Sequence, residues 1–405
     1  MSGGKGGADA VTVSGVTGRG TAGANLLALR SHNAALVLDL LRGAGAEGIS
    51  RLELAERTGL TPQAVSKITA RLRQQGLAAE AGRRASTGGK PRTVLRLVPE
   101  AGHAVGVHVD RDELRLVVVD LNGTVTGERR GPLNLGAGAE SVVATVAREV
   151  EGLVGEVLGG GAAEAALTAA EGTRPRLSPR LSDVGTLVGV GVALPGPLDH
   201  RCGVLHRVTG FPEWDGFPLR DALARRLGVP VVVDKDTNAA ALGLAVAGEG
   251  RSFAYLHLGT GLGAGLVIGG SVHRGARTGA GEFGHQVIQL DGPLCGCGDR
   301  GCVEALCLAA VGRGEFAEAA RVLGAGAANL VGLLDIELVL LGGRTVAAAP
   351  EVFVTGVADV LAARARREGA PGDAVPVRTA PGGERGVAEG AAQLLLAPMF
   401  GRGDG

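Results

Sequence analysis

Residues 281–304 have the sequence GEFGHQVIQLDGPLCGCGDRGCVE. This stretch holds one histidine and three cysteines within 18 residues: His285, Cys295, Cys297 and Cys302. A closed tetrahedral zinc site takes four such ligands and leaves no coordination position for a catalytic water. We therefore expect these side chains to hold a structural Zn2+, without metal catalysis. The alternative is a set of buried free thiols.

Two further cysteines, Cys202 and Cys307, lie outside this motif, and we expect both to behave as small apolar residues. An odd, clustered set of five cysteines favours metal binding or free thiols over disulfides, as in a reducing compartment. The first residues, MSGGKGGADA, contain no apolar segment of a signal peptide, and no apolar run reaches the ~20 residues of a membrane span. We therefore expect a cytoplasmic protein.

Upstream of the cysteine motif, two apolar segments end in residues suited to phosphate or hydroxyl chemistry. Residues 258–265, LGTGLGAG, follow one of them. Alternate glycines let backbone amides approach a phosphate, here at Gly259, Thr260, Gly261 and Gly263. Asp236 follows the other segment, where its carboxylate would act as a general base toward a hydroxyl group.

Residues 99–405 alternate apolar runs with stretches of helix length, which indicates an α/β domain. Two runs, residues 104–110 and 114–120, precede a hairpin-type turn at Asn122 and Gly123. The other apolar runs are residues 187–194, 229–233, 253–258 and 338–341. Low-complexity residues 158–182 predict a mobile loop inside this domain, and residues 1–25 predict a disordered tail.

Residues 26–98 predict a winged helix-turn-helix. A first helix contains apolar residues at helical spacing near residues 36–41, and Ser50 with Glu53 forms a capping-box pattern at a second. The third helix begins after Thr61, and its expected buried stripe is Val65, Ile68 and Leu72. Two short strands, residues 77–81 and 93–98, follow, and the Gly-, Ser- and Pro-containing residues 82–92 between them predict an irregular connection.

The formal net charge of the chain is zero, but its two parts differ in sign. Residues 1–97 carry 14 basic and 6 acidic side chains, a net charge of +8, so the remainder carries −8. A basic domain neutralises DNA phosphates and releases counterions, although a charged helix face is also typical of simple solvation. The expected DNA contacts are Gln63, Ser66, Lys67 and Arg71 on the third helix, and Arg83, Arg84, Lys90 and Arg92 on the wing.

From about residue 26 to residue 400 the chain resembles the ROK family (repressors, open reading frames and kinases). Residues 281–304 are similar to the family signature, and VALPGPL, VVVDKDTNAAALG, LGTGLGAGLVIGG and LLDIELVLLGG resemble its other blocks. The resemblance implies an actin-like, two-lobed sugar-kinase fold, preceded here by the winged helix of the repressor branch. It assigns zinc to the four ligands above, sugar hydroxyl contacts to Glu282, His285 and Glu304, the catalytic base to Asp236, and the second phosphate loop to GTGLGAG.

One family element differs. Kinases of the family have a first phosphate loop of the form DxGGT, whereas this chain has Asp110-Arg111-Asp112-Glu113. Two carboxylates in place of glycines would repel ATP and block close backbone contact. Phosphoryl transfer depends on positioning and charge neutralisation, which one base cannot replace. We therefore expect no catalytic residues and no kinase activity, with Asp236 a vestigial base and GTGLGAG a vestigial phosphate loop.

Two positions of the expected sugar pocket differ as well. Lys235 stands where the family has Asn, and Gly210 stands where an Asn is expected before the loop that contains Trp214. With Lys235 and Asp236 among the sugar contacts, the added cation suggests an anionic or phosphorylated sugar. The alternative is that Lys235 pairs with Asp234 or another carboxylate and points away from the pocket.

Together these features predict a sugar-responsive DNA-binding transcriptional regulator, most simply a repressor, which binds paired half-sites of double-stranded operator DNA as a homodimer or higher homo-oligomer. Sugar binding would close the lobes and change the placement of the winged helices. One alternative is an ATP-dependent sugar kinase with a fused DNA-binding domain. Another is a regulator that has lost ligand binding, since the segment between Cys302 and Leu338 is shorter than is usual in the family.

Overall fold

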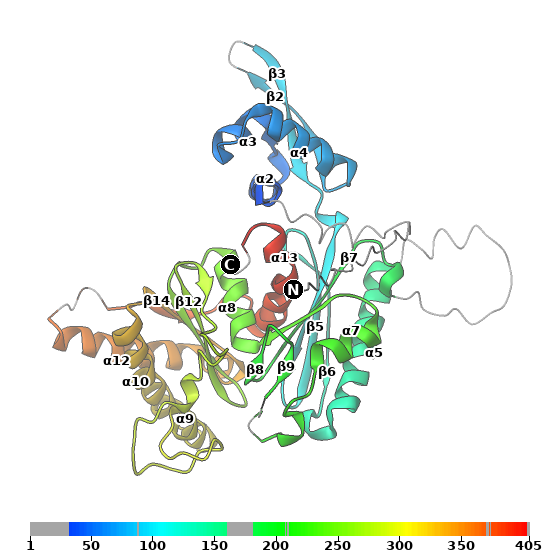
Figure 1. Ribbon diagram of the computed structural model, residues 1–405. Helices are drawn as coiled ribbons and strands as arrows, with labels where there is room; N and C mark the ends of the chain where they lie inside the picture. Colours follow the sequence, from blue (N-terminus) through cyan, green and yellow to red (C-terminus); the bar gives the residue numbers. More distant parts are fainter. Residues whose placement is uncertain are drawn as a thin grey trace, which may run out of the picture.

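The computed structural model describes residues 32–86, 89–159, 181–206, 208, 210–369, 372 and 374–402, and the side chains of residues 83–91 lie outside this description. The predicted tail, residues 1–25, also lies outside the described residues, as does nearly all of the predicted loop at residues 158–182. Within the described parts, a small N-terminal domain stands on a larger two-lobed domain (Figure 1).

The N-terminal domain is a winged helix-turn-helix, as predicted. Its elements are α2 (His32–Gly43), β1 (Ile49–Ser50), α3 (Arg51–Thr58), α4 (Pro62–Gln74), β2 (Ala78–Ser86) and β3 (Gly89–Leu97). The capping box of α3 is present: Glu53 N donates to Ser50 Oγ (3.3 Å) and Ser50 N donates to Glu53 Oε2 (2.9 Å). Thr61 caps α4 through its side chain, which accepts from Ala64 N (3.3 Å). Local sequence signals therefore set both helix starts.

The wing differs from the prediction. The expected irregular connection at residues 82–92 is wrong, because β2 and β3 continue through it as an antiparallel pair as far as Ser86 opposite Gly89. Gly82, with φ of 129°, lies at a register shift in β2 and accommodates an irregular residue. Pairing across the hairpin satisfies backbone groups that a single segment leaves unpaired, so it overrides the local preference of Gly and Ser.

The first lobe of the larger domain is a five-stranded sheet of order β10-β7-β4-β5-β6. Its strands are β4 (His103–Val109), β5 (Glu113–Asp120), β6 (Val125–Pro132), β7 (Leu187–Leu194) and β10 (Val231–Lys235). β4, β7 and β10 are parallel, whereas β5 and β6 continue as antiparallel strands. A short ribbon, β8 (Leu198–Asp199) and β9 (Val204–Leu205), follows β7.

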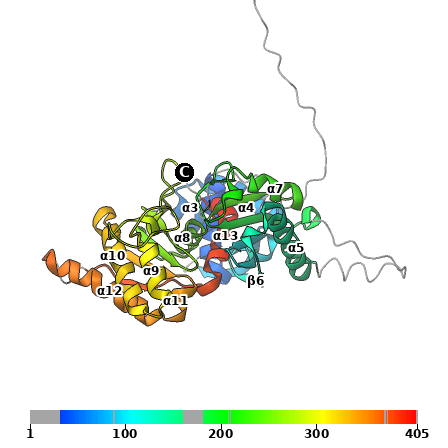
Figure 2. The ribbon, with the colours of Figure 1, turned by 90° about the horizontal axis from the view of Figure 1, so that it is seen from below.

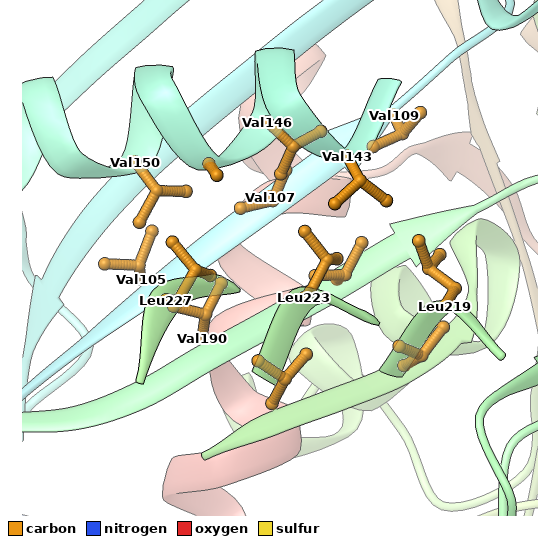
Figure 3. Close-up of a cluster of buried hydrophobic side chains, with 14 of the residues drawn as sticks. Val105, Val107, Val109, Val143, Val146, Val150, Val190, Leu219, Leu223 and Leu227 are labelled. Atoms are coloured by element: carbon orange, nitrogen blue, oxygen red, sulfur yellow. The ribbon is translucent and has the colours of Figure 1, made fainter. Parts of the chain in front are cut away.

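Helices α5 (Ala139–Leu158) and α7 (Leu219–Leu227) cover one face of this sheet (Figure 3). The side chains of Val143, Val146 and Val150, spaced by one helical turn, point from α5 toward the valines of β4 and β7. Each such buried side chain contributes about 1.5–3 kcal/mol. This apolar layer therefore fixes α5 and α7 to the sheet and leaves the strand ends free to carry polar groups.

The second lobe has a five-stranded sheet of order β13-β12-β11-β14-β15. Its strands are β11 (Phe253–Leu258), β12 (Leu262–Ile268), β13 (Ser271–Val272), β14 (Leu338–Gly342) and β15 (Val377–Thr379). Its helices are α9 (Val303–Gly312), α10 (Phe316–Leu334), α11 (Arg344–Ala348) and α12 (Pro350–Arg367). In the view from below, this lobe and the first lobe lie on opposite sides of the central helices (Figure 2).

Two helices, α8 (Asp236–Ala247) and α13 (Gly386–Met399), lie between the two sheets (Figure 1). They approach closely because Gly390 has no side chain: a Cβ there would lie 2.0 Å from Ala239 O. A Cβ on Gly243 would likewise lie 3.0 Å from Gly390. The pair therefore packs nearly backbone to backbone and forms the centre of the larger domain.

The end of α13 anchors the N-terminal domain. Phe400 shares a buried apolar cluster with Leu41 of α2 and lies 4.0 Å below the Arg42 guanidinium. Asp39 of α2 accepts from Arg42 (2.8 Å) and from Arg402 (3.0 Å). The winged helix-turn-helix is therefore packed on the larger domain, and joined to it by more than the covalent linker.

Among the described helices, α10 is long and apolar enough to cross a membrane. Half of its most apolar segment is buried inside the protein, and the helix packs against α9 and α12. Burial of this kind is typical of a core helix.

Candidate functional site

A cleft of about 90 Å³ is lined by the turns where the two lobes meet. All five predicted sugar contacts line it: Lys235, Asp236, Glu282, His285 and Glu304. Lys235 ends β10 and Asp236 begins α8, whereas Glu304 lies in the first turn of α9. Residues almost 70 positions apart in the sequence therefore face one small space, although sugar binding itself stays a prediction.

Lys235 is buried, with 4% of its side chain exposed. Its Nζ donates to Ala280 O and to Glu282 Oε1 (3.0 Å). Asp234 instead pairs with Arg274, whose Nε donates to Asp234 Oδ2 (2.8 Å) and whose Nη2 lies 2.7 Å from the same oxygen. Lys235 thus pairs with another carboxylate, as the second interpretation expects, and yet it lines the cleft.

Two carboxylates of the cleft have no ion pair among the described residues. Asp236 Oδ1 accepts from Thr237 N (2.6 Å), and Glu304 Oε2 accepts from Leu262 N (2.8 Å). A carboxylate has about four acceptor sites, so both groups keep capacity for further donors. A hydroxyl group can donate a hydrogen bond to such a carboxylate. The cleft is therefore able to bind a hydroxyl-rich molecule.

The four predicted metal ligands come together. The ligand atoms of His285, Cys295, Cys297 and Cys302 all lie within 4.8 Å of one another. Cys295 Sγ is 3.6 Å from His285 Nδ1, and Cys297 Sγ is 3.7 Å from Cys302 Sγ. Zn–S bonds of about 2.3 Å and Zn–N bonds of about 2.0 Å at tetrahedral angles require separations of about 3.8 and 3.5 Å. The cluster therefore fits a tetrahedral metal ion.

The thiols of this cluster do not ionise easily by themselves. Burial, followed by its neighbouring thiols, raises the pKa of Cys302 to about 12. A bound cation reverses this by stabilising the thiolates. Outside the cluster Cys307 is buried, but the prediction for Cys202 is wrong: it is exposed in the turn between β8 and β9, where its Sγ donates to Asp199 Oδ2 (3.4 Å).

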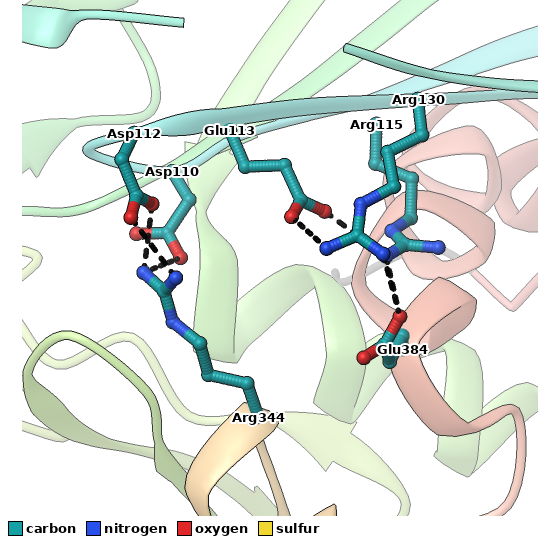
Figure 4. A network of polar contacts seen from close by, with 7 residues as sticks. All are labelled: Asp110, Asp112, Glu113, Arg115, Arg130, Arg344 and Glu384. Carbon is teal, nitrogen blue, oxygen red and sulfur yellow. Dashed lines mark hydrogen bonds and ion pairs between the residues drawn. The ribbon is translucent and has the colours of Figure 1, made fainter. Parts of the chain in front are cut away.

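The turn at Asp110–Glu113 joins β4 to β5, and its acidic side chains form ion pairs with arginines (Figure 4). Arg344 donates to both oxygens of Asp112, at 3.0 and 2.7 Å, and to Asp110 Oδ2 at 3.4 Å. Hydrogen bonding from Arg344 lowers the pKa of Asp112 below its ordinary value. The place expected to hold the phosphates of ATP therefore holds an internal ion pair.

The glycine-rich turn at residues 259–261 joins β11 to β12 as a tight hairpin, closed by Gly259 N donating to Gly261 O (2.9 Å). Thr260, Gly261 and Gly263 line the cleft, whereas Gly259 is not among its lining residues. A Cβ on Gly261 would lie 3.1 Å from Glu304 Oε2, and one on Gly263 would lie 3.1 Å from Thr237. These glycines therefore allow neighbouring side chains to approach the turn.

A second cavity, of about 120 Å³, adjoins the Asp110–Glu113 turn and contains groups that the sequence did not single out. His108 of β4 and His257 of β11 line it, together with Arg344. Burial lowers the pKa of His108, and its Nε2 has no partner among the described residues. A single polar residue in an apolar strand is a weak sequence signal for a binding site. Only the packing of the two lobes, which brings His108 and His257 together, identifies this cavity.

The predicted DNA-contacting residues of α4 face solvent. Val65 and Leu72 are buried as expected, Thr69 is buried in addition, and Ile68 is only half-buried. The exposed residues are Gln63, Ser66, Lys67 and Arg71 on α4 and Arg92 on β3. The side chains of Arg83, Arg84 and Lys90 lie outside the described residues. This domain projects from one end of the molecule, which leaves the α4 face and the wing accessible (Figure 1).

The fold and these sites define a class: a winged helix-turn-helix joined to a two-lobed, sugar-kinase-like domain with a Cys3His cluster. Residues 177–314 match the ROK family, and residues 37–78 match winged helix-turn-helix DNA-binding proteins. Residues 177–314 thus carry a ROK family domain, as the sequence motifs predict.

Curated relatives of the chain include sugar repressors. It is 28% identical over 260 residues to the xylose repressor of Bacillus subtilis, which covers 63% of this chain and 61% of the relative. It is 28% identical over 287 residues to the DNA-binding transcriptional dual regulator NagC of Escherichia coli, which covers 70% and 64%. The matched segment thus spans about 60% of the length of these relatives.

Solved structures share the fold. A ROK family transcriptional regulator, a homologue of the Escherichia coli MLC protein, has a TM-score of 0.68 at 20% identity, covering 92% of this chain and 98% of that protein. A ROK family glucokinase from Streptomyces griseus, in complex with glucose and AMPPNP, has a TM-score of 0.55 at 26% identity, covering 73% and 99%. The predicted fold class is therefore confirmed.

Proposed function

We propose that this protein is a sugar-responsive DNA-binding transcriptional repressor whose kinase-like domain transfers no phosphate. One observation carries the second half of this proposal: Arg344 binds Asp110 and Asp112 at the turn where a kinase of the family presents glycines to ATP. The similarity to repressors and the exposed basic face of α4 support the first half. Such a protein acts in the cytoplasm, where its DNA is.

We propose that α4 reads operator DNA in the major groove and that the wing grips the backbone. The groups involved are Gln63, Ser66, Lys67 and Arg71, with Arg83, Arg84, Lys90 and Arg92 on the wing. A helix-turn-helix protein of this kind binds paired half-sites as a dimer. Sedimentation of the full chain with and without a palindromic operator measures this assembly.

We propose a neutral, hydroxyl-rich sugar as the ligand of the cleft. The charge of Lys235 is already matched by Glu282, and Asp236 and Glu304 add two carboxylates that would repel a phosphorylated sugar. The contacts would come from Lys235, Asp236, Glu282, His285 and Glu304. Titration calorimetry with matched neutral and phosphorylated sugars tests this, and tighter binding of the phosphorylated form would contradict it.

We propose Zn2+ as the metal of the Cys3His cluster. The metal would neutralise the thiolates and cross-link the cysteine-rich loop. The sugar would contact protein side chains beside the cluster: His285 belongs to it, and Glu304 Oε1 lies 3.9 Å from Cys295 Sγ. Elemental analysis of the purified chain should give about one zinc per chain. A Cys297→Ser variant should contain none.

Two measurements test the main proposal. DNA sequences selected by the full chain from a random pool provide the operator, and fluorescence anisotropy then follows operator release as D-xylose, N-acetylglucosamine or glucose is added. Release by one neutral sugar supports a sugar-responsive repressor. If no sugar raises the melting temperature or releases DNA, the regulator without ligand binding is favoured, because a ligand of the folded state must stabilise it.

The retained Asp236 is the observation that favours the alternative, a sugar kinase with a fused DNA-binding domain. An ADP-release assay with the same sugars distinguishes it. Turnover that disappears in an Asp236→Asn variant would overturn the proposed lack of phosphate transfer.

A further inference from the structure

Arg344 reaches from one lobe to the other. It is the first residue of α11 in the second lobe, and its guanidinium forms a two-pronged contact with Asp112 in the first (Figure 4). Asp110 of the same turn is held twice from the second lobe: Arg344 lies 3.4 Å from Oδ2, and Thr260 Oγ1 donates to Oδ1 (2.9 Å). Two separate elements of the second lobe are therefore bonded to one turn of the first.

A second set of ion pairs lies where the chain returns to the first lobe. Glu384 lies two residues before α13, and its Oε2 is 2.6 Å from Arg115 and 3.5 Å from Arg130. These arginines of β5 and β6 also bind Glu113. The start of α13 is thus tied to the same end of the first sheet that Arg344 holds (Figure 4).

We propose that these contacts form an interlobe latch: ion pairs within the chain, at the turn expected to hold the phosphates of ATP, hold the lobes in the arrangement that forms the cleft of the candidate site. Asp110 and His257 line both the sugar cleft and the cavity beside the latch. The latched turn is therefore also a wall of the cleft. Contacts within the chain thus join the two lobes at this turn.

The latch is weak enough to open. The side chains of Asp112 and Arg344 are 58% and 40% exposed, and exposed ion pairs are screened by salt. Its state reaches the N-terminal domain through one element, because α13 begins two residues after Glu384 and is followed by Phe400 and Arg402, which contact α2. Opening of the latch would therefore shift α13 and the segment after it, on which α2 of the winged helix-turn-helix packs.

Hydrogen exchange measured by mass spectrometry on the full chain, without sugar or DNA, tests the latch. In Arg344→Gln, amides of the turns at 110–113 and 258–262 should exchange roughly three- to tenfold faster. The substitution releases the 110–113 turn from α11 and leaves it joined to the 258–262 turn by the Thr260–Asp110 hydrogen bond, which should then open more often. The wild-type protein in 1 M salt should show the same increase, whereas added salt should change Arg344→Gln little.

The matched control is Arg321→Gln, which removes an exposed arginine of the same lobe whose partner, Glu318, lies on the same helix. Equal acceleration in this control, or unchanged exchange in Arg344→Gln, would overturn the latch. Asp112→Asn should reproduce part of the effect, and combining it with Arg344→Gln should add little, since both substitutions remove the Arg344–Asp112 contact. Additive effects would also overturn the proposal. Because neither sugar nor DNA is present, the result is independent of the proposed repressor function.

Discussion

Two groups of carboxylates in and beside the interlobe cleft differ in what binds them. In the first group, Asp236 and Glu304 line the cleft, accept from backbone amides and have no ion pair among the described residues. In the second group, which belongs to the turn between β4 and β5, Asp110, Asp112 and Glu113 are bound by arginines. A carboxylate is available to a ligand only where the protein leaves its acceptor sites free. Residue type alone therefore does not distinguish a binding group from a structural one.

The largest expected effect comes from removing the metal, which should loosen the cysteine-rich loop and spare the turn at 110–113. Cys302→Ser, or chelation of the wild type, should destabilise the cysteine-rich loop by several kcal/mol, because loss of a structural metal belongs to the most damaging changes. Hydrogen exchange should rise in residues 286–302 and stay unchanged at 110–113. Equal acceleration at both places would show that the cysteine-rich loop and the turn at 110–113 are not independent.

A matched pair of substitutions sharpens the same comparison. Asp236→Asn should weaken binding of the responsive sugar about 10- to 100-fold, since it replaces a charged acceptor worth about 1.5–3 kcal/mol per hydrogen bond. Asp112→Asn should weaken it less than about threefold, because this carboxylate is engaged with Arg344. Titration calorimetry on both variants measures the ratio. Similar losses in the two variants would contradict the assigned difference.

A change outside the cleft separates DNA binding from ligand binding. Lys67→Ala should weaken operator binding about fivefold and reduce the slope of log K against log salt by about 1, as expected for one lost phosphate contact. Sugar affinity should stay as in the wild type. Arg321→Ala is the control for a general loss of positive charge, and gel shifts over a salt series provide both numbers.

The smallest expected effect concerns the pH dependence of the Arg344–Asp112 pair in the latch. Arg344 lowers the pKa of Asp112, so the pair stabilises the folded state above the ordinary carboxyl pKa of 3.8 and this contribution disappears as pH falls through the lowered value. Because Asp112 is largely exposed, the contribution should stay below about 1 kcal/mol. Denaturant unfolding of wild type and Asp112→Asn between pH 3 and 7 should show the difference shrinking at the acid end. A constant difference would remove Asp112 from the latch.

Much of the N-terminal domain follows from local sequence. Ser50 with Glu53, and Thr61 before Pro62, mark helix starts that the structure reproduces, because caps satisfy amides within a few residues. The wing does not follow in the same way. Residues 82–92 have the composition of a loop, yet they form strands, because their hydrogen-bond partners lie on the opposite strand of the hairpin.

The candidate site divides along the same line. By itself the sequence determined the members of the Cys3His cluster, the carboxylates of the cleft and the ROK family domain, because each is carried by closely spaced residue types such as those of CGCGDRGC. Only the tertiary structure decided that Lys235 binds Glu282, that Arg344 binds Asp110 and Asp112, and that His108 faces a cavity. These contacts join residues 47 to 234 positions apart, and their geometry is set by the packing of two sheets, which no local pattern encodes.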